Sequence, residues 1–346
     1  MRVSMPSLVR VVFLIFLLCA AQFADAQAEK KLRRIGVLAR MSSLSELEAR
    51  SGPPQGPARL LEEGLKKLGW VDGQNIQFVW KSAEGEPDRL DGLAEELVRE
   101  RVDVIVAMGG VSNAFKKTKT IPIVMAGSVF LPVEAGYAVS LARPGKNVTG
   151  LSLGSEPRIS NKVIALLKEA IPGASRIAMI WGDRAPAPKD IKDMSDAAKE
   201  DQADMDALGV TLLPMTYWGP SALPGAFEEA VRQGAKAMLI LITPGVGRKE
   251  EQDMIRELAI RHRMPVAHNY LPQREWGGIL AYGNDPTVRW KRLPYYVDRI
   301  LRGANPGDIP IEEPTRYELH VNLKSAKAIG VTIPGSLLIR ADRVIE

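Results

Sequence analysis

The most restrictive feature of this sequence is a regular alternation of short apolar runs with amphipathic helical segments. The clearest example is the stretch 101–113, RVDVIVAMGGVSN. Its apolar, β-branched run is bounded by charge before it and by Gly109 and Gly110 after it, which predicts a strand buried on both faces and hence a parallel sheet. Ser112 can cap the helix that follows. Ligands of open α/β sheets bind where such strands end and such helices begin, so this loop is a candidate ligand wall.

The same alternation divides the remaining chain into two similar sets. Apolar residues at helical spacing separate the strands within each set. The first set has predicted strands at 35–40, 76–80, 102–108, 121–127 and 148–153. The second set has predicted strands at 176–182, 210–215, 237–243, 265–270 and 277–283. This order predicts an α/β fold with two doubly wound, Rossmann-like lobes.

The C-terminal part continues with shorter elements. A helix is predicted at 288–301, where Pro294 must kink the helix or make it restart. The tail carries one more predicted strand at 318–322 and a short helix that ends at Ile329.

Residues 1–26 have the pattern of an export signal. Arg2 and Arg10 accompany an apolar run at 11–18, and residues 24–26, Ala-Asp-Ala, form a small-x-small cleavage site. The run is shorter than the ~20 residues that span a bilayer. We therefore expect a cleaved signal peptide and a soluble periplasmic protein that begins at Gln27.

The only cysteine of the chain, Cys19, lies inside this segment. A lipoprotein anchored there is the alternative, although bulky Leu17 and Leu18 precede the cysteine where small residues are expected. Cleavage after Ala26 leaves a chain without disulfides. The net charge of +5 is spread along the sequence without a basic block, so we expect no nucleic-acid partner. We also expect a monomer.

Motifs of the common catalytic and metal sites are absent from the sequence. The three histidines, His262, His268 and His320, are not spaced as zinc ligands, and no HExxH is present. No GxSxG, P-loop or GxGxxG follows a predicted strand. The sequence therefore predicts no metal site, no cofactor and no catalytic constellation. His268 lies at the end of a predicted strand. A histidine there more often has a structural role, but it is also placed to line a cleft.

Polar and aromatic residues gather instead at the predicted strand ends. Each alone is more typical of structure than of function, but the set suits a mostly apolar small-molecule pocket in a cleft between the lobes. These candidate ligand-binding residues are Arg40, Met41, Ser42, Gly109, Gly110, Ser112, Ser128, Phe130, Trp181, Asp183, Tyr217, Trp218, Thr243, Asn269, Tyr270 and Tyr282.

Several long segments, in order, resemble the ABC transporter substrate-binding protein family that includes the tryptophan- and tyrosine-binding lipoproteins. They are LGWVDGQNI (68–76), AEGEPDRLDGLAEELV (83–98), VDVIVAMGG (102–110), SLARPGKNVTG (140–150) and PTRYELHVNLKSAKAIGVTIPGSLLIRADRVIE (314–346). The resemblance implies a type 1 periplasmic-binding fold with two lobes, crossover segments and a hinged cleft. It also implies delivery of a small molecule to a membrane permease with its ATPase.

Analogy with type 1 binding proteins also implies the extent of the lobes. Lobe one is expected at 31–150 plus about 286–305, and lobe two at 151–285 plus about 306–346. Four features depart from the family. The segment before Gly277 is shorter than usual, and Pro294 enters a helix that is normally free of proline. Gly109, Gly110 and Val111 replace a Gly-Thr-Pro-like turn, and residues 131–133, Leu-Pro-Val, replace Asp-Pro-Val. The identity of the pocket is thus specific to this chain.

The expected ligand is an amino acid or a related amphipathic carboxylate. In lobe one, the N–H groups around Gly109 and Gly110 suit a carboxylate. In lobe two, Trp181, Tyr217 and Trp218 suit an apolar group, and Asp183 suits an amino group. Packing of Trp218 between helices is the structural alternative.

Two other functions remain open. A sensor that presents its ligand to a membrane receptor has the same sequence features. A secreted α/β enzyme fits the fold but lacks a recognisable nucleophile and base. Neighbouring genes for a permease and an ATPase would distinguish an importer from both.

Overall fold

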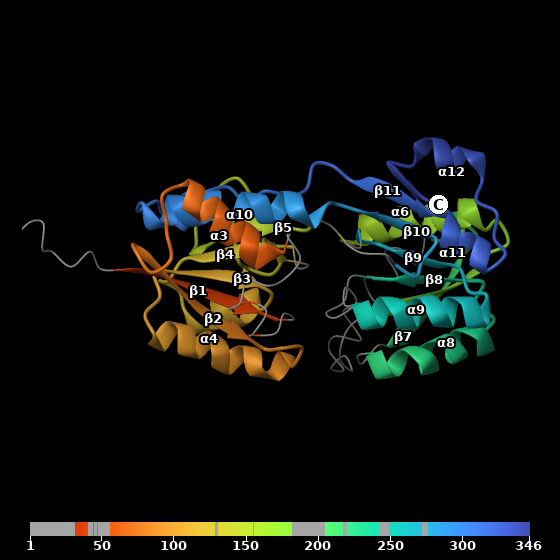
Figure 1. Cartoon of the computed structure of the whole chain (residues 1–346), viewed down its shortest axis with the longest axis horizontal. Coiled ribbons are helices and arrows are strands. Elements are labelled where there is room, and N and C mark those ends of the chain that lie inside the picture. Colours follow the sequence, from red (N-terminus) through yellow and green to blue (C-terminus); the bar gives the residue numbers. More distant parts are fainter. Residues whose placement is uncertain are drawn as a thin grey trace, which may run out of the picture.

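The computed structural model describes residues 32–40, 44, 47, 56–128, 131–154, 156–181, 205–216, 220–241, 249–271 and 276–346. These residues form two sheets, each with helices on both faces (Figure 1). We call the five-stranded sheet with the helices packed on it the first lobe, and the seven-stranded sheet with its helices the second lobe. The predicted two-lobed α/β fold is confirmed.

The first lobe is built on a fully parallel sheet in the order β2-β1-β3-β4-β5. Its central strands are almost completely buried, as the apolar run at 104–108 predicted. The strands are β1 (Arg33–Ala39), β2 (Ile76–Ser82), β3 (Val104–Met108), β4 (Ile123–Ser128) and β5 (Val148–Ser152).

Helices cover both faces of this sheet because parallel strands expose apolar side chains on either side. One face packs against α3 (Pro57–Lys67) and α10 (Pro286–Leu301). The other packs against α4 (Leu90–Arg99), which follows the short η1 (Pro87–Arg89), and α5 (Val111–Lys117). Helix α10 therefore leaves the second lobe in sequence and packs on the first lobe in space (Figure 1).

The second lobe has the strand order β12-β11-β10-β9-β8-β6-β7, and all neighbours are parallel except β10 and β11. The strands are β6 (Arg176–Trp181), β7 (Thr211–Thr216), β8 (Ala237–Ile240), β9 (Val266–His268), β10 (Leu280–Gly283), β11 (Glu318–Asn322) and β12 (Arg343–Ile345).

Helices again cover both faces of this sheet. The first face packs against α6 (Glu156–Ala170), α11 (Leu323–Ala328) and α12 (Gly335–Arg340). The second face packs against α8 (Leu223–Arg232) and α9 (Lys249–His262). Two further short elements are η2 (Pro220–Ala222) and η3 (Pro306–Asp308). No helix in the described ranges is long and apolar enough to cross a membrane.

The two sheets repeat one topology. The order β2-β1-β3-β4-β5 in the first lobe matches β7-β6-β8-β9-β10 in the second, strand for strand along the chain. In both, the order reverses beside the first strand of the set, which places a switch point between β1 and β3 and another between β6 and β8. Ligands of open α/β sheets bind outside the carboxyl ends of the strands at such points.

The C-terminal elements narrow one sequence prediction and add to another. Helix α10 runs through Pro294 without a restart, and Gly64 of α3 makes room for the proline ring, which a side chain at that position would overlap. The tail adds α12 and β12, which are too short for their periodicity to stand out in the sequence.

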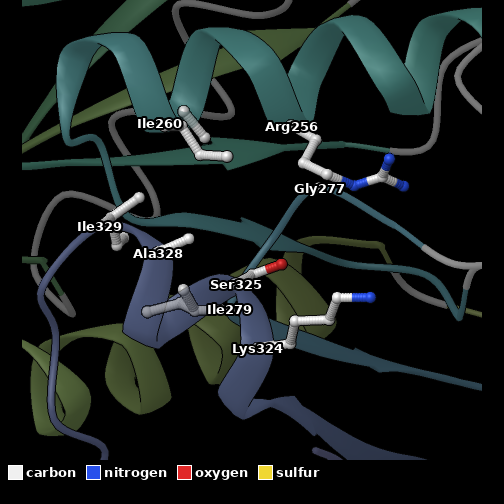
Figure 2. A pocket seen from close by; sticks show the side chains of 9 residues that line it. Arg256, Ile260, Gly277, Ile279, Lys324, Ser325, Ala328 and Ile329 are labelled. Carbon is white, nitrogen blue, oxygen red and sulfur yellow. The ribbon is translucent and has the colours of Figure 1, made fainter.

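A small cavity of about 110 Å³ lies in the second lobe, away from the carboxyl ends of its strands. It is lined by the C-terminal half of α9, by Ile279 just ahead of β10 and by α11. Figure 2 shows the charged ends of Arg256 and Lys324 pointing away from Ile260 and Ile329. This small, mostly apolar hollow lies between α9, α11 and the segment ahead of β10, and it is separate from the carboxyl ends of the strands.

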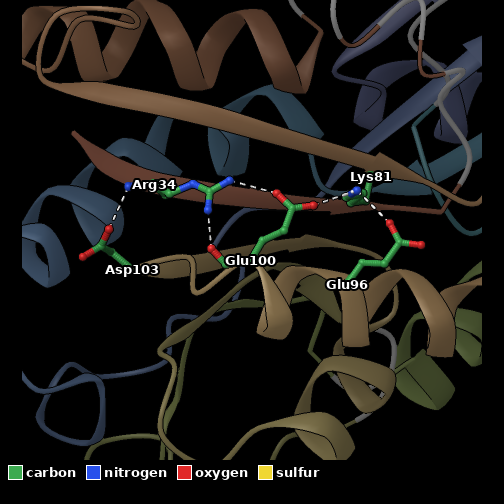
Figure 3. Close-up of polar contacts among 5 residues, drawn as sticks. All are labelled: Arg34, Lys81, Glu96, Glu100 and Asp103. Carbon is green, nitrogen blue, oxygen red and sulfur yellow. Dashed lines mark hydrogen bonds and ion pairs between the residues drawn. The ribbon is translucent and has the colours of Figure 1, made fainter. Parts of the chain in front are cut away.

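A chain of charged groups connects β1, β2 and α4 in the first lobe (Figure 3). The Glu100 carboxylate accepts from Arg34 Nη2 at 2.9 Å and pairs with Lys81 Nζ at 2.9 Å. Lys81 Nζ also lies 2.7 Å from Glu96 Oε2. The hydrogen bond from Lys81 keeps the pKa of Glu100 below its usual range, and the bond to Glu96 raises the pKa of Lys81. This network fixes the end of α4 to the sheet edge.

Gly150 provides the sharpest test of sheet packing. Its φ is 117°, and a Cβ there would lie 2.6 Å from the backbone N of Met125 on the neighbouring strand. Gly150→Ala should therefore lower the free energy of unfolding by about 2–4 kcal/mol, because backbone strain and overlap add. Gly92 is an exposed residue of α4, and a Cβ there would meet no atom within 4 Å. Gly92→Ala should therefore raise the free energy of unfolding by about 0.5–1 kcal/mol. Denaturant midpoints of both variants test this, and equal effects would contradict the packing.

Candidate functional site

The carboxyl ends of the two sheets face each other across the space between the lobes (Figure 1). Three segments connect the lobes at one side of this space: 153–154 after β5, 284–285 between β10 and α10, and 313–317 ahead of β11. The candidate site therefore consists of the carboxyl ends of the strands in the two facing sheets and of the connecting segments beside them. We call the carboxyl ends of the strands the edge of each lobe.

The first lobe presents the predicted glycine loop at this edge. Gly109 and Gly110 have φ of 111° and 71°, and Gly110 precedes α5 in the left-handed conformation. The predicted cap at Ser112 is wrong, because α5 already begins at Val111 and no side chain caps it. A Cβ on Gly109 would lie 2.6 Å from Cβ of Arg40, which itself follows β1 directly. Glycine is thus needed at 109 because the ends of β1 and β3 approach each other closely. Ser112 bonds within the lobe, to Asn113 and to the Tyr137 hydroxyl.

The connecting segments carry a second group of predicted and unpredicted residues. Tyr282 stacks on Tyr317, with ring centroids 5.8 Å apart and 17° between the planes. The rings therefore join the end of β10 to the segment ahead of β11. Beside them, Arg289 Nη1 in the first turn of α10 donates to Asn284 Oδ1 at 2.7 Å.

The guanidinium of Arg289 lies against the end of β4. Its Cζ and Nε are each 3.5 Å from where a Cβ on Gly127 would lie, and Gly127 occupies a break in the register of β4 with β5. Within the described ranges no residue accepts a hydrogen bond from its buried Nε. Burial lowers the pKa of Arg289 to about 10, so the group remains a cation at neutral pH. A positive charge thus stands at the first-lobe edge.

The second lobe presents a buried polar cluster at its edge. Glu251, in the first turn of α9, is 1% exposed, and neither carboxylate oxygen has a hydrogen-bond partner in the described part of the chain. Burial raises the pKa of Glu251 to about 7. The neighbouring Gln252 donates from Nε2 to the Tyr270 hydroxyl at 3.0 Å. Glu251 also raises the pKa of Tyr270, although burial contributes more.

His268 completes this cluster at the end of β9. It is 0% exposed and lies edge-on to Tyr270 and Trp276, with ring centroids 5.0 and 5.5 Å away. Burial lowers its pKa to about 3, so the ring is neutral. Its ring nitrogens have no hydrogen-bond partner among the residues described. The predicted site residue Asn269 follows it and is 4% exposed.

The remaining predicted site residues fall wholly or partly outside the described residues. Ser128 and Trp181 end β4 and β6, so their backbones lie at the expected edges. The others lie outside the described ranges: Met41, Ser42, Phe130, Asp183, Tyr217, Trp218 and Thr243. The ligand-binding role of the predicted set stays a prediction. The described residues also contain no group of three metal-binding side chains.

Glu251 and Arg289 are absent from the predicted site residues, although their helical spacing indicates that both lie on the buried side of a helix. Glu251 lies four and seven residues before Ile255 and Leu258, on the apolar stripe of α9. Arg289 lies four residues before Leu293 on the buried stripe of α10. A charge on an apolar stripe in a first helical turn marks a buried group beside the strand ends.

Comparison with known proteins identifies the family. The family model for ABC transporter substrate binding proteins matches residues 35–345. The chain belongs to this family. The resemblance found in the sequence is therefore confirmed.

One relative and two solved structures are similar to this chain over most of its length. A tyrosine-binding protein from Clostridioides difficile is 25% identical over 303 residues, which are 87% of this chain and 81% of that protein. A conserved domain protein from Vibrio cholerae has a TM-score of 0.75 and 26% identity, over 91% of this chain and 100% of that one. An ABC domain from Streptococcus pneumonia in complex with L-Trp has a TM-score of 0.73 and 20% identity, over the same shares.

Titration of Glu251 should be visible in the stability of the protein. Its folded pKa of about 7 exceeds the value of 4.5 in the absence of burial, so the folded state holds the proton more tightly. Stability should therefore fall as pH rises from 4.5 to 7, by up to about 3 kcal/mol. Glu251→Gln removes this loss, so its advantage over wild type should grow between pH 5 and pH 8 in denaturant titrations.

The exposed neighbour Glu250 supplies the control for this titration. Glu250→Gln should keep the pH dependence of the wild type. An advantage of Glu251→Gln that is equal at pH 5 and pH 8 would show that Glu251 is not buried as described.

Proposed function

We propose that this chain is the ligand-binding component of an ABC importer, which encloses a small molecule between its two lobes and presents it to a permease and its ATPase. The family match over residues 35–345 carries this proposal. The facing strand edges support it, because closure of two lobes about connecting segments encloses a ligand without chemistry.

The proposed ligand is an amino acid or a related amphipathic carboxylate. The name of the Clostridioides difficile relative, a tyrosine-binding protein, supports this class. The charges at the two edges also suit it, since a cation at Arg289 and an acid at Glu251 complement a carboxylate and an amino group. The N–H groups around Gly109 and Gly110 for the carboxylate, and Asp183 for the amino group, are the alternative assignment for the same ligand class.

The division into lobes and the position of the hinge are also proposed. The predicted division is lobe one at 31–150 plus about 286–305 and lobe two at 151–285 plus about 306–346. Leu151 and Ser152 belong to β5 of the first sheet, which favours extending lobe one to 152. Packing of Ile309 and Ile311 in the cores of the first lobe favours extending lobe one through that segment. The stacked pair Tyr282 and Tyr317 lies where the connecting segments leave the second lobe.

Export is the third part of the proposal. The charged start, apolar run and small-x-small site of residues 1–26 support a cleaved signal peptide and a periplasmic protein from Gln27 onward. A binding component outside the cytoplasm needs such a signal to meet its ligand and its permease.

Ligand binding should be visible as stabilisation of residues 27–346. A ligand that binds only the folded state adds about 2.7 kcal/mol at a hundredfold excess over Kd. In a thermal-shift screen of amino acids and aromatic carboxylates, followed by calorimetry, we expect at least one saturable ligand that is recovered unchanged. Failure of every compound would contradict the ligand class.

Other outcomes separate the alternative functions. Chemically altered ligand in the recovered sample would favour a secreted enzyme. If the purified protein binds a ligand but cells that lack its gene take up that ligand normally, a sensor that reports to a membrane receptor is favoured.

A further inference from the structure

Arg289 occupies an unusual place for a charged residue. It lies in the first turn of α10, directly after segment 284–285, on the same helical stripe as the fully buried Leu293 and Tyr296. The helix thus carries a cation on its buried side, at the end that faces the space between the lobes (Figure 1). A buried charge is unfavourable unless a counter-charge or hydrogen bonds compensate it.

The described partners compensate Arg289 only in part. Nη1 donates to Asn284 Oδ1, a neutral acceptor. Asp285 interacts with the cation through its charge but not through a hydrogen bond. Its carboxylate accepts instead from the Thr287 backbone N at 2.8 Å and from the Thr287 hydroxyl at 2.7 Å. The buried Nε has no described acceptor. The edge of the guanidinium formed by Nε and Nη2 therefore has no hydrogen-bond partner in the described part of the chain.

Arg292, one turn further along α10, shows the contrast. It forms a bidentate ion pair with Glu312, with Nη2 2.7 Å and Nε 3.1 Å from the carboxylate oxygens. This pair ties α10 to the segment that returns toward the second lobe. Nothing comparable in the described chain faces Arg289, although planar guanidinium edges match carboxylates.

The guanidinium of Arg289 packs against the backbone of Gly127. Gly127 lies at a register break near the end of β4, with φ of 112°, and the guanidinium packs 3.5 Å from where its Cβ would lie. Bulges of this kind occur next to binding sites, where they redirect a strand. The guanidinium of Arg289 therefore lies within van der Waals range of the end of β4, and it is the φ of 112° that favours glycine at position 127.

We propose that Arg289 binds the carboxylate of the ligand through its Nε and Nη2 edge, at the hinge end of the space between the lobes. Asn284 positions the guanidinium from segment 284–285, so the bound carboxylate is connected directly to a segment between the lobes. This assignment rests on the proposed function and names the group in the site that selects carboxylates.

Calorimetry on residues 27–346 tests the assignment. The probes are L-tyrosine, L-tryptophan and L-leucine, each beside the amine that lacks the carboxylate: tyramine, tryptamine and 3-methylbutylamine. The wild type should bind at least one acid, and should bind its amine roughly 30- to 1,000-fold more weakly, as expected for loss of a buried charge partner. Equal affinity for an acid and its amine would overturn the assignment.

Variants locate this selectivity in the structure. Arg289→Met should weaken binding of the acid by a similar factor and remove the preference over the amine, whereas Arg289→Lys should recover part of the loss. Arg292→Met, which breaks the ion pair with Glu312, should keep the acid-to-amine ratio of the wild type. Thermal unfolding shows that each variant is folded.

The failures of the two proposals are distinguishable. If the wild type binds an acid and Arg289→Met binds it within threefold of the wild type, the assignment is wrong while ligand binding stands. If the wild type binds none of the three acids, both the assignment and the proposed ligand class are wrong.

Discussion

Burial of parallel sheets on both faces is the constraint on which this structure depends. Each parallel strand needs a crossover helix, so helix N-termini and strand ends collect at one edge of each sheet. In this chain the two edges face each other, and α10 crosses from the second lobe to cover the first sheet beside α3. Close packing of Gly64 against Pro294 accommodates that crossing. The position of the candidate site is therefore a consequence of how the sheets are covered.

The segments between the lobes combine firm attachment with few contacts of their own. Arg292 and Glu312 attach the returning segment to α10, and the Tyr296 hydroxyl donates to the Pro310 carbonyl at 3.2 Å. Further along, the Tyr282 and Tyr317 rings stack on each other. We expect each lobe to move as a unit and movement to concentrate in these short segments, as in other proteins whose domains close about a hinge.

Much of the fold was predictable from the sequence, and less of the site was. Strand periodicity and the turn at Gly109 and Gly110 gave the correct strands and the loop between β3 and α5. The two sets of alternating elements also predicted the two lobes, and the family resemblance added the expectation of a hinged cleft between them. Glu251 and Arg289 were missed because a charged residue on a helix is usually solvated, and only its place on the apolar stripe indicates burial. Strand β12 has three residues, too few for a periodic pattern.

Measurement of the distance between the lobes tests the central claim most directly. The only cysteine, Cys19, lies in the predicted signal peptide, so residues 27–346 accept spin labels at introduced cysteines alone. Gly92→Cys in α4 and Val231→Cys in α8 place labels on exposed positions of the two lobes, on the side away from the connecting segments (Figure 1). The account predicts a shorter and narrower distance distribution by double electron–electron resonance when ligand saturates the protein. An unchanged distribution at saturation by calorimetry would contradict it.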